Sequence, residues 1–201
     1  MLDVDDIRRA LLAYEPTLHE GELQHLAAVA VVLRDNAGSL DLLLIERAQR
    51  TGDPWSGHMA FPGGRVDAAD TTARAAAERE TLEEVGLSLA GSEFLGRLDD
   101  LPGRPAPPGD FAVSAFVFYT CDPGALALNH EVRDAFWFSL DALLDPERHI
   151  DHPAKVESDR LYPGILVGEP GRHVVWGLTY HFLDQFLEIL GQPFFRRAPR
   201  S

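Results

Sequence analysis

The sequence predicts an α/β sandwich, in which a β-sheet packs against flanking helices. Two apolar runs, 26–33 and 40–45, are separated by the polar turn 34–39 and are typical of consecutive buried strands. Segments with helical spacing or helix-forming composition lie at 4–14 and 72–85. Because both kinds of element occur in a chain of 201 residues, we expect them to share one hydrophobic core.

The expected elements follow in chain order. The first helix has Val4, Ile7 and Leu11 on one face, and Pro16 helps to end it. After the two strands, a loop rich in Gly and Pro covers 50–64. The later elements are a helix over 72–85, strands over 94–98, 111–119 and 135–138, a helical turn over 140–144, and a strand leading into a helix over 174–190. The proline-rich loop 101–109 is either a wall of the substrate site or a plain connector.

The domain organisation is expected to be simple. We expect a single domain over 1–201, made of a helical extension (1–24), a core (25–192) and a loose basic tail (193–201). No apolar run approaches the ~20 residues that span a bilayer, and the first residues lack the pattern of a secretory signal. The one cysteine, Cys121, excludes an internal disulfide and fits the cytoplasm, and we expect its side chain to be buried at a strand end. A homodimer remains an option for the assembly.

The charge of the chain narrows the choice of partners. Eighteen basic and 32 acidic side chains give a net charge of −14, which repels polyanions such as nucleic acid or an anionic membrane. Nearly all the basic residues are arginines, whose planar fork suits phosphate; those that flank the segments discussed below are Arg47, Arg50, Arg65 and Arg104. If the substrate is an anion, bound divalent cations must offset the local carboxylates.

The helix over 72–85 carries the pattern that best predicts chemistry. It has candidate N-caps at 70–72 and a terminator at Gly86, and Glu80, Glu83 and Glu84 fall on one face at spacing i, i+3, i+4. Like charges at this spacing repel each other, so a cation such as Mg²⁺ between them would stabilise the arrangement. The alternative is that the glutamates coat a solvent-exposed helix. The alanine-rich face beside them and the glycine turn 63–64 favour the metal site.

This segment resembles a known motif. The run Arg79–Leu87 is similar to the second half of the Nudix box, which reads Arg-Glu, a mostly apolar residue, any residue, Glu-Glu, any residue, Gly and an apolar residue. Thr81 departs mildly from the apolar position, and Thr71 stands where the box has its first glutamate, with Asp70 one residue earlier. The run 61–70 resembles the Phe-Pro-Gly-Gly-x-x-Asp-x-x-Asp pattern of coenzyme A pyrophosphatases, whereas 48–56 departs from that subgroup's signature.

The resemblance, which extends over about 26–190, implies a fold, an activity and a set of site residues. The fold is a Nudix-type α/β/α sandwich with a mixed sheet between helices. The glutamates Glu80, Glu83 and Glu84 would bind Mg²⁺ or Mn²⁺ together with the carbonyl of Gly63 or Gly64, and Arg79 would orient a glutamate. Glu131 would be a ligand or general base, or else an ordinary acid of a surface loop. Substrate contacts are expected from Phe61, Gly63, Gly64, Arg47 and Arg65, although core packing is the alternative for Phe61.

The implied reaction is metal-dependent hydrolysis of the diphosphate linkage in a nucleoside diphosphate derivative. The first candidate substrate is coenzyme A or acyl-CoA, which would give 3′,5′-ADP and 4′-phosphopantetheine. ADP-ribose, a dinucleotide or a nucleotide sugar is the alternative. A non-catalytic binding or regulatory module of the same fold is a second alternative, which the retained glutamates disfavour.

Overall fold

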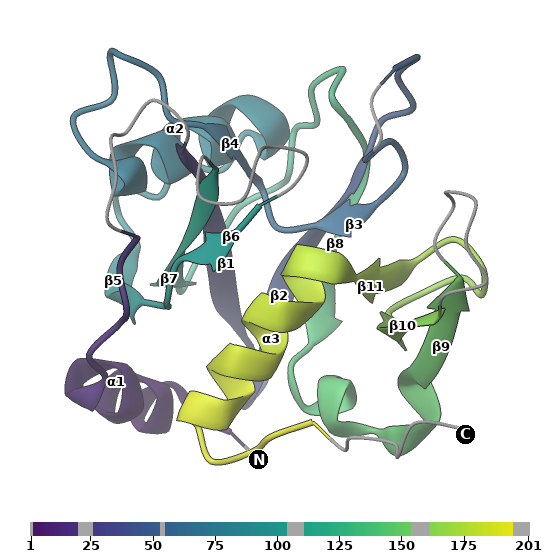
Figure 1. The fold of residues 1–201 in the computed structure, drawn as a ribbon. Coiled ribbons are helices and arrows are strands. Elements are labelled where there is room, and N and C mark those ends of the chain that lie inside the picture. The colour runs from purple at the N-terminus through teal and green to yellow at the C-terminus, as the bar shows by residue number, and fades with distance from the viewer. Residues whose placement is uncertain (1, 20–25, 53–54, 104–110, 154–160, 195–201) are drawn as a thin grey trace.

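The computed structural model describes residues 2–19, 26–52, 55–103, 111–153 and 161–194 (Figure 1). Within these ranges, eight strands form one mixed sheet. At its centre, β1 (Leu26–Asn36) pairs antiparallel with β2 (Ser39–Arg47) and parallel with β7 (Ala112–Thr120). The remaining strands of the sheet are β3 (Met59–Ala60), β4 (Gly63–Arg65), β5 (Glu93–Arg97), β6 (Leu101–Pro102) and β8 (Val132–Ser139).

Helices cover both faces of this sheet. Alternate side chains of β1 point to opposite sides, as strand geometry requires. One set packs in a core with α2 (Ala73–Val85), and the other in a core with α1 (Val4–Ala13) and α3 (Gly177–Ile189). Figure 1 shows α3 crossing the sheet, with α1 near its C-terminal end. The predicted α/β/α sandwich with a mixed sheet is confirmed.

A second, smaller sheet lies beside the N-terminal end of α3. It consists of β9 (His149–Pro153), β10 (Leu161–Leu166) and β11 (Val174–Trp176), all antiparallel. β11 begins the segment 174–190, which was predicted as a strand leading into a helix, whereas β9 and β10 were not predicted. Both contain a proline, and β10 also contains Gly164, residues that ordinarily indicate turns.

Three local features bear on the predictions: the turn between β1 and β2, the exposure of Cys121 and the burial of Phe194. The turn between β1 and β2 consists of Ala37 and Gly38, both with positive φ (51° and 89°), as a two-residue hairpin requires. The expectation that Cys121 is buried is wrong: β7 ends one residue earlier, and the thiol is exposed. Phe194, inside the predicted loose tail, is buried against His149 and Tyr180.

Parts of two expected segments cannot be compared with the structure. Most of the proline-rich loop 101–109 and the tail from 195 onward lie outside the described residues. None of the described helices has the length and apolar character needed to cross a membrane.

Candidate active site

The ends of α2 set the direction in which its glutamates point. Of the three candidate caps, Thr72 caps the helix, and its hydroxyl accepts the Ala75 N–H at 3.0 Å. At the other end Gly86 adopts a left-handed conformation (φ 70°), and its N–H donates to the carbonyl of Leu82. In this register Glu84 is buried, Glu80 is partly exposed, and Glu83 is exposed. The buried Thr81 is tolerated because its hydroxyl donates to the carbonyl of Ala77 at 2.7 Å.

Glu84 is a buried carboxyl group beside the glycine turn. It is 2% exposed, and its Oε2 accepts the N–H of Gly63 at 2.9 Å. Burial raises the pKa of Glu84 to about 7, the charges of Glu80 and Glu131 add to the rise, and the Gly63 hydrogen bond and the charge of Arg47 oppose it. The positive charge around Glu84 is therefore too small to offset the cost of burying its ionised form.

Glu80 lies against the backbone of the same turn. A Cβ atom added at Gly64 would stand 2.5 Å from Cδ and Oε1 of Glu80, so any other residue would force this carboxylate to move. Gly63 is equally restricted, because its φ is 152° and a Cβ there would collide with the carbonyl of Ala28. Burial also raises the pKa of Glu80, although Arg79 opposes the shift. The glycine pair thus brings two desolvated carboxyl groups to one backbone turn.

Arg79 is the centre of an ion-pair network beside these groups. Its guanidinium binds both oxygens of Asp70 (3.1 and 3.0 Å), and it also contacts Glu80 at 3.0 Å and Glu83 at 3.1 Å. A further N–H donates to the carbonyl of Arg65 at 3.1 Å. Arginine suits this role because its donors form a rigid fork.

Asp70 lies one residue before Thr71, which stands where the Nudix box has its first glutamate. Its side chain is 6% exposed, accepts the N–H of Asp67 at 2.8 Å and is held by Arg79, whose hydrogen bonds lower the pKa of Asp70. The acid one residue before Thr71 is therefore engaged with Arg79.

Glu131 approaches the two buried glutamates from the loop before β8. Its charge contributes to the raised pKa of both Glu80 and Glu84, so it lies near both. Arg50 donates to Oε1 of Glu131 at 2.7 Å, and the backbone carbonyl of Glu131 accepts the N–H of Ala48 at 2.7 Å. The side chain is 35% exposed, which leaves it open to water.

Among the predicted substrate contacts, Arg47 and Arg65 lie near residues of α2, whereas Phe61 lies in the core on the other side of the sheet. Arg47 lies close enough to Glu84 for its charge to lower that residue's pKa, and the side chain of Arg65 is exposed while its carbonyl holds Arg79. Phe61 is 2% exposed and belongs to the core on the α3 side of the sheet. Its ring is therefore packed away from the carboxylates, in agreement with the alternative considered for it.

The α2 carboxylates fit a divalent cation. Hard cations of this kind prefer oxygen ligands, and burial raises the pKa of both Glu80 and Glu84, with the charge of Glu131 adding to each shift. Among the described residues, the group whose ligand atoms lie within 4.8 Å of one another is a different one, formed by Glu46, Asp134 and His173. There, Arg172 contacts Glu46 at 2.6 Å and Arg133 contacts it at 3.2 Å, so guanidinium groups already neutralise this carboxylate.

Glu46 was not predicted as a buried charge, although its position in β2 carries a signal. Leu42, Leu44 and Glu46 alternate along β2 and share the core face, so a charge at the third position requires a buried partner. That partner, Arg172, is far away in the sequence and could not be identified without the fold.

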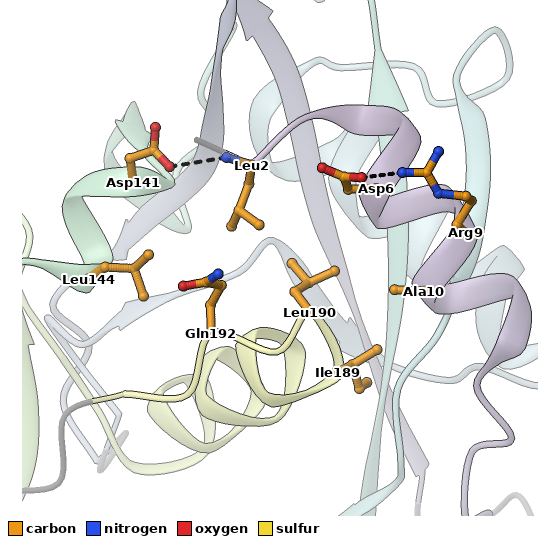
Figure 2. Close-up of a pocket in the computed structure, with 9 residues that line it drawn as sticks. All are labelled: Leu2, Asp6, Arg9, Ala10, Asp141, Leu144, Ile189, Leu190 and Gln192. Atoms are coloured by element: carbon orange, nitrogen blue, oxygen red, sulfur yellow. Dashed lines mark hydrogen bonds and ion pairs between the residues drawn. The ribbon is translucent and has the colours of Figure 1, made fainter.

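A cavity of about 480 Å³ lies on the opposite face of the sheet, between α1 and the C-terminal end of α3 (Figure 2). Its charged lining groups are the exposed pair Asp6 and Arg9, and Asp141, which accepts the Leu2 N–H at 3.4 Å. The rest of its lining is mostly apolar, with Leu2, Leu144, Ile189 and Leu190 around it. The predicted catalytic residues lie elsewhere, so we place the candidate site at α2.

Comparison with known proteins gives the family. The NUDIX domain model matches residues 24–158. The chain belongs to the Nudix family. This Nudix chain is 38% identical over 199 residues to the uncharacterized Nudix hydrolase NudL of Klebsiella pneumoniae, a match that covers 96% of this chain and 97% of that protein. It is 31% identical over 169 residues to the human mitochondrial coenzyme A diphosphatase NUDT8, covering 82% and 69%.

Solved structures agree on the fold. The Nudix hydrolase RenU of M. smegmatis aligns with a TM-score of 0.55 at 18% identity, covering 87% of this chain and 91% of that one. Other relatives are much longer: the chain spans 34% of an uncharacterized Schizosaccharomyces pombe protein and 60% of a probable nudix hydrolase from the same organism. Nudix hydrolases generally use divalent metal cations and act on small nucleotide-derived substrates.

Proposed function

We propose that this Nudix chain is a metal-dependent pyrophosphohydrolase that cleaves the diphosphate linkage of a nucleoside diphosphate derivative. The observation that carries the proposal is the pair of desolvated carboxyl groups, Glu80 and Glu84, held against the glycine turn Gly63-Gly64. Two neighbouring acidic groups with raised pKa values are costly for folding, and such a cost is typical of a functional site. A non-catalytic module would have no need of them.

The metal site proposed here uses Glu80, Glu83 and Glu84, with the carbonyl of Gly64 as a further ligand, and takes Mg²⁺ or Mn²⁺. When bound, the ion would polarise the phosphoryl group and lower the pKa of a bound water. Glu83 now contacts Arg79 and its side chain is 54% exposed, so it can turn toward an ion without unpacking the core. Arg79 positions Glu80, and Asp70 positions Arg79.

Proton transfer is assigned to Glu131. Its Oε1 is held by Arg50, which fixes the orientation of the carboxylate and leaves Oε2 to accept a proton from the attacking water. Its partial exposure gives water access, in contrast to Glu84. Arg47, close to Glu84, and the exposed side chain of Arg65 would hold the diphosphate oxygens through their planar donors.

Coenzyme A or acyl-CoA is the first substrate we propose. The similarity to NUDT8, which is named a coenzyme A diphosphatase, and the run 61–70 both support it. ADP-ribose, a dinucleotide and a nucleotide sugar remain the alternatives. We also keep a cytoplasmic location and a single domain as parts of the proposal, although NUDT8 is named a mitochondrial protein.

A substrate panel tests the proposal. Coenzyme A, ADP-ribose, NADH and a dinucleoside polyphosphate are compared by kcat/KM with Mg²⁺, with Mn²⁺ and with a chelator. We expect hydrolysis of at least one of them, loss of activity with the chelator and recovery on adding either metal. Equal turnover with and without the chelator would contradict the mechanism, and a preference for ADP-ribose would overturn the coenzyme A assignment alone.

A further inference from the structure

Four aromatic side chains gather at the small sheet. The ring of Trp176 lies 4.8 Å from that of His58, 5.2 Å from that of His152 and 5.7 Å from that of Tyr162, measured between centroids. All four side chains are partly exposed. They come from the segment before β3 and from all three strands of the small sheet, so the fold brings together residues that are far apart in the sequence.

The three rings from the small sheet share one of its faces. Tyr162 pairs directly with His152, and Trp176 pairs with Gly164. Residues paired in this way point to the same side of a sheet. The opposite face carries Ile165 and Val175, which are fully buried in the core with α3. The aromatic face is therefore the one turned away from the core.

This aromatic face is held in place by its surroundings. A Cβ atom at Gly164 would stand 2.9 Å from Val174 Cγ1 and 3.2 Å from His152 Cβ, so glycine keeps the centre of the face clear of a side chain. The strand that carries Trp176 follows Arg172, which contacts the buried Glu46 at 2.6 Å. The ring of Trp176 is thus mounted on a strand tied to the main sheet.

The aromatic face is also a neighbour of the α2 site. The N–H of Arg47 donates to the carbonyl of His58 at 3.0 Å, and the carbonyl of Arg47 accepts the Gly57 N–H at 3.1 Å. The charge of the same arginine lowers the pKa of Glu84. Arg47 therefore connects the buried carboxyl groups on one side with His58 and Trp176 on the other.

We propose that this aromatic face binds the purine base of the substrate by stacking on Trp176, while the diphosphate lies at α2. This inference rests on the proposed function. Planar bases stack on aromatic side chains regardless of their detailed pattern of donors and acceptors. A chain of net charge −14 also needs non-ionic contacts to hold an anionic nucleotide.

The test compares two ligands that differ only in the base. AMP and ribose 5-phosphate are titrated calorimetrically into the full chain with Mg²⁺. We expect AMP to bind more tightly, and Trp176→Leu to weaken AMP binding roughly ten-fold or more while ribose 5-phosphate binding stays the same. Trp176→Phe, which keeps an aromatic ring, should retain most of the affinity. Trp137→Leu is the matched control, because that indole packs with Arg34 in the main sheet.

Two results would overturn the inference. One is equal affinity of the wild-type chain for AMP and ribose 5-phosphate, and the other is unchanged AMP affinity in a folded Trp176→Leu chain. If that variant does not fold, Tyr162→Leu replaces it, and the same loss of AMP affinity is required. Because neither ligand is hydrolysed, an AMP preference without hydrolysis of any diphosphate would reject the proposed function alone. Hydrolysis without an AMP preference would reject the base site alone.

Discussion

Replacing Gly64 with alanine tests how closely the backbone turn and Glu80 fit together. The new Cβ would lie 2.5 Å from the carboxyl carbon of Glu80, whereas ordinary contact begins near 3.4 Å, so the carboxylate must move by about 3.4 − 2.5 = 0.9 Å. A displacement of about 1 Å at a reacting centre costs on the order of 100-fold in rate. Because the clashing atoms are the end of a flexible, partly exposed side chain, the methyl group should cost little stability.

The assay is kcat for the best substrate of the panel, together with the melting temperature. Gly91→Ala is the matched control, because a Cβ there meets no atom within 4 Å and its φ is not positive. We expect Gly64→Ala to lose about two orders of magnitude in kcat and Gly91→Ala to keep its activity. If Gly64→Ala were folded and as active as the Gly91→Ala control, Glu80 would not need its position against the turn.

Two further predictions concern Asp70 and Glu84. Asp70→Asn removes the charge that holds Arg79, so kcat should fall with little change in KM. The matched control is Asp67→Asn, whose carboxylate is 69% exposed and 3.8 Å from Arg79, and it should have little effect on kcat. Equal effects of the two substitutions would reject a positioning role for Asp70. Burial holds the pKa of Glu84 near 7 in the folded chain against an ordinary 4.5, so the folded state binds this proton more readily than the unfolded state. In a chelator, the free energy of unfolding should therefore fall as the pH rises from about 4.5 to 7, and Glu84→Gln should remove that loss. Thermal melts across this range, with the exposed Glu83→Gln as control, measure the effect; identical pH profiles for the wild-type chain and Glu84→Gln would contradict it.

Much of α2 could be predicted from the sequence because its signals are local. The candidate caps at 70–72 and the terminator at Gly86 both act within one helix, and the structure uses Thr72 and Gly86 at the two ends. The different burial of Glu83 and Glu84 could not be predicted in the same way. It depends on how closely α2 approaches the turn at Gly63, which only the packing of the helix on β1 and β4 determines.

The remaining features depend on contacts between distant segments. The engagement of Asp70 with Arg79 requires the loop after β4 to fold back on α2, and neither residue type alone indicates it. Two strands of the small sheet, β9 and β10, were missed because each contains a proline, and β10 also contains a glycine. Consequently the grouping of Trp176 with His58 could not be anticipated.

The activity of Glu84→Gln in a metal-controlled assay is the most direct test of the proposal that α2 carries the active site. This substitution keeps the size of the side chain and removes its charge, so the chain should fold at least as stably as the wild type. We expect kcat for diphosphate hydrolysis to fall by orders of magnitude with Mg²⁺ or Mn²⁺ present. If the folded variant turned over substrate at the wild-type rate, α2 would not be the active site.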